Sequence, residues 1–368
     1  MKEIRQIVAL YEQLVEENVP SALAVVLEVE QSSYRRVGAR LLVAADGRYV
    51  GGISGGCLEG DALKRAKKAI AFGTSSVQVY DTTDGEDAVI GIGLGCEGRI
   101  RVGFIPLDYS RPNEVTLLKG LLDIREPSVL FRLLNNLHPI TDAPGMQVEL
   151  LDFSAPPTEQ GAREYDVLSC RELGQAALDS GRSVVTPLPV KQLHSFTKLH
   201  ALFEVIHPTT HLVVTGTNYD IPPTLRAAKL LGWKCSVVGA RRKITREIAG
   251  LADATFDYSE VDKITIDNAT AIALMSHDYD WDRRMVQHFV PLKPRYFGML
   301  GPRKRMVKMD ESLPELDLAG YPNLYAPVGL DIGAETPEEI AASLVGEIVA
   351  VFRGRGGGLL RRRVGSIH

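Results

Sequence analysis

Apolar side chains recur among charged ones in the N-terminal residues, with the period of an α-helix. The apolar positions that give this period are Ile4, Ile7, Val8, Tyr11, Leu14 and Val15. Short strand-like segments bounded by Gly, Asp and Ser turns follow, and they cover residues 22–30, 40–44, 77–80 and 99–105. The pattern predicts a mixed α+β first domain that begins with an amphipathic helix.

A different pattern begins near His200, where continuous apolar runs alternate with helical segments. The runs cover residues 211–215, 234–238, 269–275 and 296–300, and a last helix begins at Pro337. Apolar strands that alternate with helices indicate a parallel sheet covered on both faces, as in a doubly wound Rossmann-like domain. We therefore predict an α/β protein with a first domain over residues 1–200 and a Rossmann-like domain over residues 201–352.

Two stretches have a less regular pattern. Residues 108–200 mix short helical and strand patterns around the polar, proline-bearing segment 154–163, and we interpret them as a variable connecting region of the first domain. Residues 353–368 are rich in glycine and then basic, with Arg361, Arg362 and Arg363. This composition predicts a flexible basic tail.

Composition narrows the class of protein. The 368 residues are enough for two domains with separate cores, and a formal net charge of −4 argues against a nucleic-acid binder. The N-terminus lacks the features of a signal peptide, and no apolar run reaches membrane-spanning length. The cysteines form neither a zinc-binding spacing nor a disulfide framework, and they are Cys57, Cys96, Cys170 and Cys235. We expect a cytoplasmic protein without a membrane span.

A glycine-rich loop at residues 51–60 carries the first candidate site. It follows a predicted hairpin that turns at Asp46-Gly47, and it precedes a predicted helix over residues 58–72. Glycines let backbone N–H groups converge on one point, and a helix N-terminus aims its positive dipole end there. The loop is either an anion site with a reactive or ligating thiol or a tight strand-to-helix turn. The residues assigned to the anion site are Gly52, Ser54, Gly55, Gly56 and Cys57.

The turn after residues 211–215 is where a dinucleotide fingerprint would lie. It reads Gly216-Thr217-Asn218-Tyr219-Asp220-Ile221 rather than G-x-G-x-x-G. Asn218 stands where a second glycine would let the backbone approach a pyrophosphate. Gly239, rather than an acidic residue, ends the second strand, where a carboxylate would hold the ribose hydroxyls. The sequence predicts a Rossmann-like fold with weak or absent NAD(P) binding.

Other strand ends of the second half also carry polar groups. His277 follows one strand, Arg303 follows the next after Gly301, and Asp331 precedes a capping box that begins at Thr336. Ligands of open parallel sheets bind outside the carboxyl ends of the strands, so we expect these loops to converge on one crevice. We further expect this crevice and the loop at residues 51–57 to face a shared cleft, within one protomer or across a homodimer.

Four sequence blocks resemble the XdhC/CoxI family, the accessory proteins of xanthine dehydrogenase and related molybdenum hydroxylases. The blocks cover residues 32–40, 51–59, 80–98 and 326–340, and the last reads APVGLDIGAETPEEI. The resemblance implies an N-terminal XdhC/CoxI domain and a C-terminal Rossmann domain. Family members usually have Gly-Ala-Gly in the Rossmann loop and an acidic end to the second strand. This chain departs from both at Asn218 and Gly239, while Asp220 and Pro223 fit a family variant.

The resemblance also implies a function. Family members are thought to bind molybdenum cofactor, protect it during sulfuration and deliver it to an apo-hydroxylase. This cargo, molybdopterin or its cytidylated form, has a phosphate, a polar pterin and a dithiolene-bound metal. Cys57 or Cys96 would contact the molybdenum, since thiolates suit soft metals. The remaining candidate cofactor-binding residues, beyond those of the glycine-rich loop, are Arg35, Arg36, Arg40, Gly216, Asn218, Asp220, Arg303 and Asp331.

Partners and alternative functions follow from the same reading. The expected partners are a molybdenum hydroxylase apo-enzyme, a cysteine desulfurase and a second copy of the chain. The four cysteines cannot supply two iron–sulfur clusters, so the chain is not the hydroxylase itself. One alternative is an NAD(P)-dependent oxidoreductase with His277 as proton donor, and another is a nucleotide-binding regulatory module without catalysis. Whether the chain is an enzyme is left open, with Cys57 and His277 as the catalytic candidates.

Overall fold

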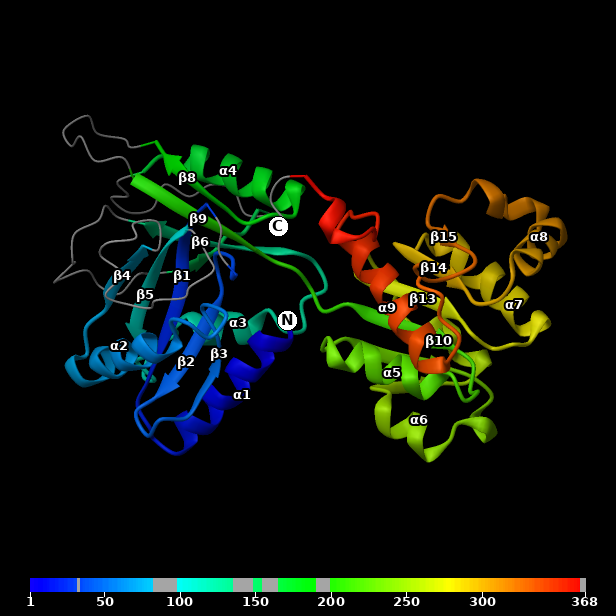
Figure 1. Cartoon of the computed structure of the whole chain (residues 1–368), viewed down its shortest axis with the longest axis horizontal. Coiled ribbons are helices and arrows are strands. Elements are labelled where there is room, and N and C mark those ends of the chain that lie inside the picture. Colours follow the sequence, from blue (N-terminus) through cyan, green and yellow to red (C-terminus); the bar gives the residue numbers. More distant parts are fainter. Residues whose placement is uncertain (32–33, 82–97, 135–147, 154–164, 190–198, 365–368) are drawn as a thin grey trace. The chain divides into compact units, whose positions relative to one another are not determined.

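The computed structural model describes residues 1–31, 34–81, 98–134, 148–153, 165–189 and 199–364. It divides into two compact units, Glu3–Pro208 with Met1 and Thr209–His368 with Lys2 (Figure 1). The predicted division after residue 200 falls inside strand β9 (Leu199–Ile206), which pairs with β6 and β8 of the first unit. The first unit therefore extends to Pro208.

A five-stranded antiparallel sheet in the order β3-β2-β1-β5-β4 forms one layer of the first unit. Alternate residues of β1 face opposite sides of this sheet, so that Leu23 packs with helix α1 and Ala22 packs with helix α2. The structure confirms the predicted N-terminal helix, the hairpin and the strands. The elements are α1 (Lys2–Glu16), β1 (Ser21–Gln31), β2 (Arg40–Ala44), β3 (Tyr49–Gly51), α2 (Glu59–Phe72), β4 (Ser76–Asp81) and β5 (Gly98–Pro106).

A second antiparallel sheet, in the order β7-β6-β9-β8, occupies the stretch that we interpreted as a variable connection. Helix α4 packs on it, with Ala177 of the helix in one apolar cluster with Phe131 and Phe203 of the strands. The described residues of the connecting region are therefore part of the fold of the first unit. Its elements are α3 (Glu114–Gly120), β6 (Ser128–Leu134), β7 (Val148–Leu150), α4 (Val167–Ser180) and β8 (Val184–Leu188).

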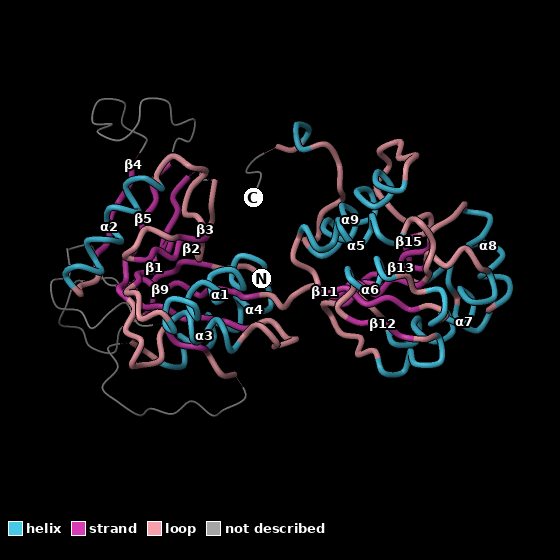
Figure 2. Tube along the Cα trace, turned by 90° about the horizontal axis from the view of Figure 1, so that it is seen from below, coloured by secondary structure: helices cyan, strands magenta, loops and turns pink. Residues whose placement is uncertain are grey.

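The second unit contains a parallel sheet in the order β12-β11-β10-β13-β14-β15, which in chain order is 3-2-1-4-5-6. This is the strand order of the Rossmann fold, and the prediction of a doubly wound domain is confirmed. Figure 2 shows strands of this sheet in magenta among the cyan helices of the unit. The strands are β10 (His211–Thr215), β11 (Lys234–Val238), β12 (Ala254–Phe256), β13 (Thr270–Leu274), β14 (Tyr296–Met299) and β15 (Leu324–Tyr325).

Helices cover both faces of this parallel sheet. Leu225 and Leu344 belong to the apolar cluster on one face, and Val286 and Met309 belong to the cluster on the other. The covering helices are α5 (Ile221–Leu230), α6 (Arg246–Leu251) and α9 (Pro337–Phe352), and on the other face α7 (Tyr279–Phe289) and α8 (Arg303–Ser312). None of the helices within the described residues is long and apolar enough to span a membrane.

Candidate functional site

The crevice of the second unit lies where the strand order reverses, between β10 and β13. Gly216 follows β10 with φ at +124°, and a Cβ placed on it would lie 2.4 Å from the carbonyl oxygen of Met275. Only glycine lets the loop after β10 pass so close to the end of β13. The predicted meeting of strand-end loops therefore holds at these two strands.

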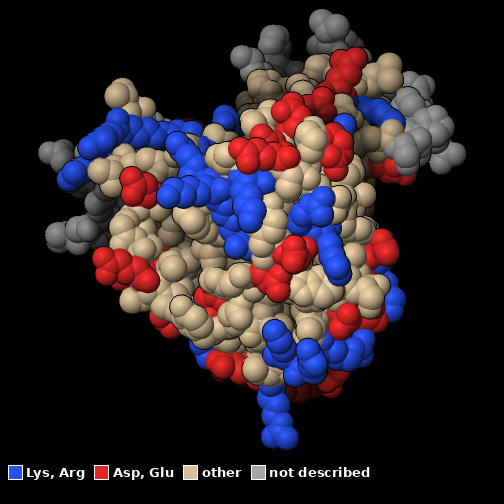
Figure 3. Space-filling model, turned by 90° about the vertical axis from the view of Figure 1, so that its right-hand side faces the viewer, with Lys and Arg blue, Asp and Glu red and all other residues tan. Residues whose placement is uncertain are grey.

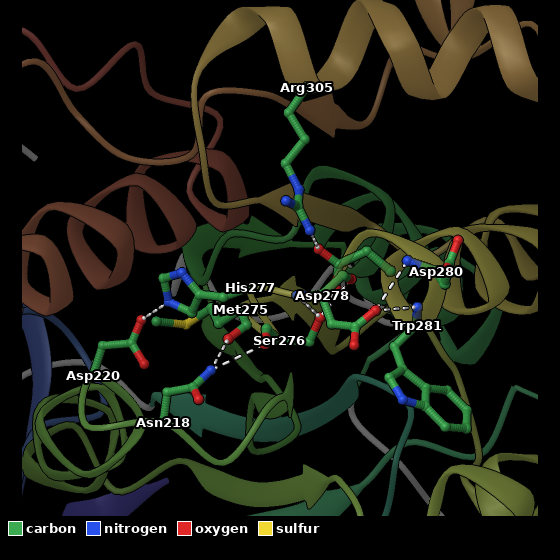
Figure 4. Close-up of polar contacts among 10 residues, drawn as sticks. Asn218, Asp220, Met275, Ser276, His277, Asp278, Asp280, Trp281 and Arg305 are labelled. Atoms are coloured by element: carbon green, nitrogen blue, oxygen red, sulfur yellow. Dashed lines mark hydrogen bonds and ion pairs between the residues drawn. The ribbon is translucent and has the colours of Figure 1, made fainter.

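Asn218 joins the two strand ends across the crevice. Its side-chain Nδ2 donates to the carbonyl oxygen of Ser276 at 3.0 Å and to that of Met275 at 3.4 Å (Figure 4). Both carbonyls belong to the residues that directly follow β13. Asn218 therefore acts as a bridge between two loops, at the position where a dinucleotide-binding protein has bare backbone.

Asp220 and His277 form a second bridge between the same loops. His277 Nε2 donates to Asp220 Oδ2 at 2.7 Å (Figure 4). Asp220 is only 5% exposed, whereas the His277 side chain is 52% exposed. His277 has φ at +56°, a left-handed backbone conformation that is uncommon outside glycine. The imidazole is thus held on a buried carboxylate and remains open to solvent.

The local sequence explains why Asp220 binds a histidine rather than its own helix. Asp220 is the N-cap residue of α5, and an N-cap carboxylate normally accepts from the N–H groups of the second or third helical residue. Those residues are Pro222 and Pro223, which have no N–H. Accordingly Asp220 makes no capping bond, and among the described residues its buried Oδ1 has no hydrogen-bond donor.

A third connection joins the loop after β13 to helices α7 and α8. Ser276 Oγ donates to Asp282 Oδ1 at 2.5 Å, and Arg305 Nη2 lies 2.6 Å from Asp282 Oδ2. Asp282 is 1% exposed, so the Arg305 guanidinium compensates a fully buried charge. Asn218 therefore links the loops after β10 and β13, and Ser276 links the second of these loops through Asp282 of α7 to Arg305 of α8. A crevice shared with the loops after β14 and β15 stays a prediction.

The other predicted residues of the second unit lie at the surface near these loops. Arg303 is exposed at the start of α8, and Asp331 is exposed in the loop after β15. Figure 3 shows Lys and Arg side chains gathered on the side of this unit that carries α7 and α8. The loop of Asp331 is fixed by the Gly329 N–H, which donates to Glu347 of α9 at 2.9 Å. The arrangement places a cation and a carboxylate at exposed strand ends.

Several features of the loop after β10 oppose the binding of a dinucleotide. Pro222 and Pro223 remove two of the N–H groups that a helix N-terminus offers to a pyrophosphate, and Asp220 places a negative charge there. A side chain at Gly239 would lie 2.4 Å from Thr217 Cγ2, so the loop has closed over the position of the usual ribose-binding acid. Weak or absent NAD(P) binding stays a prediction, and these contacts are the reasons for it.

The glycine-rich loop of the first unit is braced by its own side chains. Glu59 Oε1 accepts from the Ser54 N–H at 2.9 Å, and the Ser54 hydroxyl donates to the same carboxylate. Ser54 Oγ in turn accepts from the N–H groups of Gly56 at 3.2 Å and Leu58 at 3.0 Å. The amides of Ser54 and Gly56 in the predicted anion site, and that of Leu58 beside it, are therefore bonded within the loop, and a carboxylate lies among them.

The pKa of the Glu59 carboxyl is lowered in this loop. Partial burial alone would raise the pKa of Glu59, but the hydrogen bonds from the Ser54 hydroxyl and amide lower it more, so that the pKa falls below its ordinary value. An ionised Glu59 disfavours an incoming anion at the amides it occupies. The structure accordingly favours the braced turn over the anion nest at Ser54, Gly56 and Leu58.

The cysteines differ in exposure. Cys57 is exposed at the tip of the glycine-rich loop, directly before α2. Cys170 and Cys235 are buried, and burial raises the pKa of the Cys235 thiol to about 12. Cys96, the second proposed partner of molybdenum, lies outside the described residues. Among the described cysteines, Cys57 alone is placed to react with a molecule in solution.

The three arginines of the first unit have different surroundings. Arg35 pairs with Glu3 at 2.6 Å, and Arg36 is exposed. Arg40, by contrast, is 3% exposed in β2 and pairs with Glu114 at 2.7 Å and Glu204 at 2.6 Å. Because its guanidinium is fully engaged in the core, the prediction that Arg40 binds the cofactor is wrong, and Arg40 is a structural residue.

Several residues of these networks were not singled out from sequence. The braces Glu59 and Asp282 lie in helices, where a carboxylate usually faces solvent, and their roles depend on contacts with Ser54 and Arg305. One signal was available in the sequence. Two prolines shortly after Asp220 indicate that this carboxylate cannot cap its helix.

Comparisons with known proteins agree with this architecture. The family profile of the XdhC Rossmann domain matches residues 212–348, and the profile of the XdhC and CoxI family matches residues 14–81. A Bacillus subtilis protein named as a probable xanthine dehydrogenase component is 26% identical over 91% of this chain and 94% of its own length. Molybdenum cofactor insertion chaperone PaoD of Escherichia coli is 23% identical over 90% of this chain and 83% of its own.

A solved structure gives the same result at the level of the fold. The crystal structure of a protein named xanthine dehydrogenase from Bacillus halodurans is 25% identical, with a TM-score of 0.75 and coverage of 95% of this chain and 96% of that one. Matches to each unit and to nearly the whole chain converge on one family. The chain belongs to the XdhC and CoxI family.

Proposed function

We propose that this protein is an accessory factor that binds molybdenum cofactor and inserts it into a molybdenum hydroxylase. The observation that carries the proposal is the similarity over nine-tenths of the chain to a molybdenum cofactor insertion chaperone. The Bacillus subtilis relative, named for xanthine dehydrogenase, supports a client of that type. The Rossmann crevice supports it indirectly, because its contacts oppose the dinucleotide that this fold commonly binds.

The surface groups are compatible with such a cargo. Molybdenum cofactor combines a phosphate with a soft metal–sulfur centre, and these two ends call for cations and for an exchangeable ligand. Arg303 and Arg36 are exposed cations, and Cys57 is an exposed thiol on a braced loop. We assign the phosphate to the cations and the metal to Cys57, with Cys96 as the alternative partner.

The finer steps are part of the proposal. Cofactor would be held while its terminal sulfur is installed by a cysteine desulfurase, and the loaded protein would then dock on the apo-hydroxylase. Molybdopterin and its cytidylated form are both candidate cargoes. A homodimer would enclose the cargo more completely than one protomer.

An NAD(P)-dependent oxidoreductase with His277 as proton donor is the competing function. One observation favours it, since His277 is exposed and held by a carboxylate, as catalytic histidines often are. The closed ribose position at Gly239 and the two prolines of α5 oppose it. The same features oppose a nucleotide-binding regulatory module.

Thermal-shift titration separates these functions. A ligand that binds only the folded protein stabilises it by RT ln(1 + [L]/Kd), so molybdenum cofactor at micromolar concentration should raise the melting midpoint and NADH and NADPH should not. Replacing Arg303 with Ala should weaken cofactor retention about tenfold, since a charge-assisted hydrogen bond is lost. The control is Lys234→Ala. Lys234 is an exposed cation at the amino end of β11, whereas the candidate site lies at the carboxyl ends of the strands. Stabilisation by NADH alone would contradict the proposal.

A further inference from the structure

We propose that the crevice between β10 and β13 binds the aminopyrimidinone edge of the pterin ring, and this inference rests on the proposed function. An aminopyrimidinone presents two adjacent donors, a ring N–H and an exocyclic amino group. The crevice offers acceptors of matching chemistry from Asp220, His277 and Asn218. The inference therefore assigns one end of the cargo to the second unit.

Asp220 supplies the strongest acceptor. Its side chain is 7% exposed, and Oδ1 has no donor among the described residues, while Oδ2 is taken by His277. A buried charged oxygen without a donor is costly, so a ligand N–H that reaches it gains a charge-assisted hydrogen bond. Figure 4 shows the second carboxylate oxygen on the side of Asn218. The unpaired acceptor is thus a buried oxygen beside the loop of Asn218.

His277 adds a second acceptor through its tautomer. Because Nε2 donates its hydrogen to Asp220, the neutral ring has its lone pair on Nδ1. The side chain is 52% exposed, so Nδ1 can accept from a bound molecule. Its left-handed backbone, with φ at +56°, fixes the ring over the buried carboxylate. Strain of this kind is concentrated at functional sites.

Asn218 supplies the third hydrogen-bond acceptor of the crevice. Its amide nitrogen already donates to the carbonyls of Met275 and Ser276, which leaves the amide oxygen as an acceptor. Acceptors from three residues surround the crevice, and the prolines of α5 remove donors that an anion would need. The crevice therefore selects the donor edge of a heterocycle and disfavours a phosphate, which would orient the cargo with its pterin in this unit.

Fluorescence titration of the full-length chain tests the inference. The probes are neopterin, guanosine, cytidine and inorganic pyrophosphate. Neopterin should bind, and Asp220→Asn and His277→Asn should each weaken it about tenfold or more. Asparagine tolerates the left-handed backbone at position 277, so that variant keeps the fold even if Asp220→Asn does not. The control is His288→Asn, because His288 lies 3.5 Å from Asp262 elsewhere in the same unit.

The outcomes are distinct. Guanosine has the same aminopyrimidinone edge, so binding of neopterin and guanosine but not cytidine supports the edge, and the tighter ligand identifies its source. The inference is overturned if neopterin fails to bind, or if both crevice variants bind neopterin as tightly as the wild type does. It is also overturned if pyrophosphate displaces neopterin from the wild-type protein. If the protein retains molybdenum cofactor and neopterin does not compete, the inference fails alone. If neopterin binds and the cofactor does not, the proposed function fails alone.

Discussion

Arg40 and Glu204 form a bidentate ion pair in the core of the first unit, with nitrogen–oxygen distances of 2.6 and 2.8 Å. The pair joins β2 of one sheet to β9 of the other, and Gly38 lies so close that a Cβ on it would be 2.3 Å from the Glu204 carboxylate. Glu114 of α3 bridges Arg40 to Arg132 in the same network. The conspicuous Arg-Arg-Val-Gly-Ala-Arg segment therefore fixes the two sheets to each other at its last arginine.

Removing Arg40 should unfold the first unit readily. Arg40→Ala leaves two buried carboxylates with one guanidinium, and such a loss costs about 3–5 kcal/mol of unfolding free energy. Urea denaturation monitored by circular dichroism measures this cost. Arg48→Ala is the control, because Arg48 pairs with Glu17 and Asp46 at the surface and its loss should leave the midpoint nearly unchanged. Equal effects of the two variants would contradict a structural role for Arg40.

Acid should weaken the same network. Burial alone would raise the pKa of Glu114, but Arg132 and Arg40 lower it more, so the folded pKa lies below the ordinary value of 4.5. A depressed carboxylate pKa means that the unfolded chain binds more protons, so its stabilisation is present above pH 4.5 and is lost as the pH falls through the folded pKa. Urea midpoints measured from pH 7 downward should decline, and Glu114→Gln should flatten the decline while lowering stability at pH 7.

Gly216 should be intolerant of a side chain. Gly216→Ala places a Cβ 2.4 Å from the Met275 carbonyl in a backbone with φ at +124°, and we expect a loss of about 2 kcal/mol or more. Gly250→Ala is the matched control in the same unit, because a Cβ there meets nothing within 4 Å. In the helix α6 it should be neutral or stabilise by about 0.5–1 kcal/mol. Thermal unfolding of both variants decides whether the loop after β10 is as tightly closed as described.

Cys57 should be the first described cysteine to react. In a Cys96→Ser background, iodoacetamide should modify Cys57 in the native protein, whereas Cys170 and Cys235 should react only after unfolding. Burial raises the pKa of Cys235 to about 12, which suppresses its thiolate further. Peptide mass spectrometry of a time course gives the order. Modification of Cys235 before Cys57 would contradict the exposed position of the loop.

NAD should bind weakly or not at all, and a single substitution should not restore it. Asn218→Gly recreates the bare backbone of the fingerprint, but Pro222 and Pro223 still remove N–H donors and Asp220 still opposes a phosphate. Isothermal titration should therefore detect no binding of NAD to either protein. A low-micromolar Kd for the wild type would show that the crevice is open to dinucleotides after all.

The regular elements could be predicted from sequence because their signals are local. The strands 211–215 and 234–238 match β10 and β11 residue for residue, since each is a short apolar run bounded by polar turns. The stretch 108–200 could not be assigned in this way. Its sheet pairs β6 with β9 across a long separation in sequence, and such pairing leaves no local period.

The site was predictable in place but not in detail. Strand-end logic brings the loops of Asn218 and His277 together, because parallel strands share a carboxyl edge. The partners of these side chains depend on tertiary contacts. Sequence alone groups Arg40 with Arg35 and Arg36 as anion donors beside the glycine-rich loop, whereas two distant glutamates draw Arg40 into the core.

The most direct measurement is transfer of molybdenum cofactor to an apo-hydroxylase. The purified chain is loaded with the cofactor, separated from free cofactor by gel filtration and mixed with apo-enzyme of the xanthine dehydrogenase type. Free cofactor at equal concentration is the control, and recovery of hydroxylase activity is followed with time. The account predicts that cofactor elutes with the chain and restores activity faster and further than free cofactor does. Recovery no greater than with free cofactor, with no cofactor retained by the chain, would contradict it.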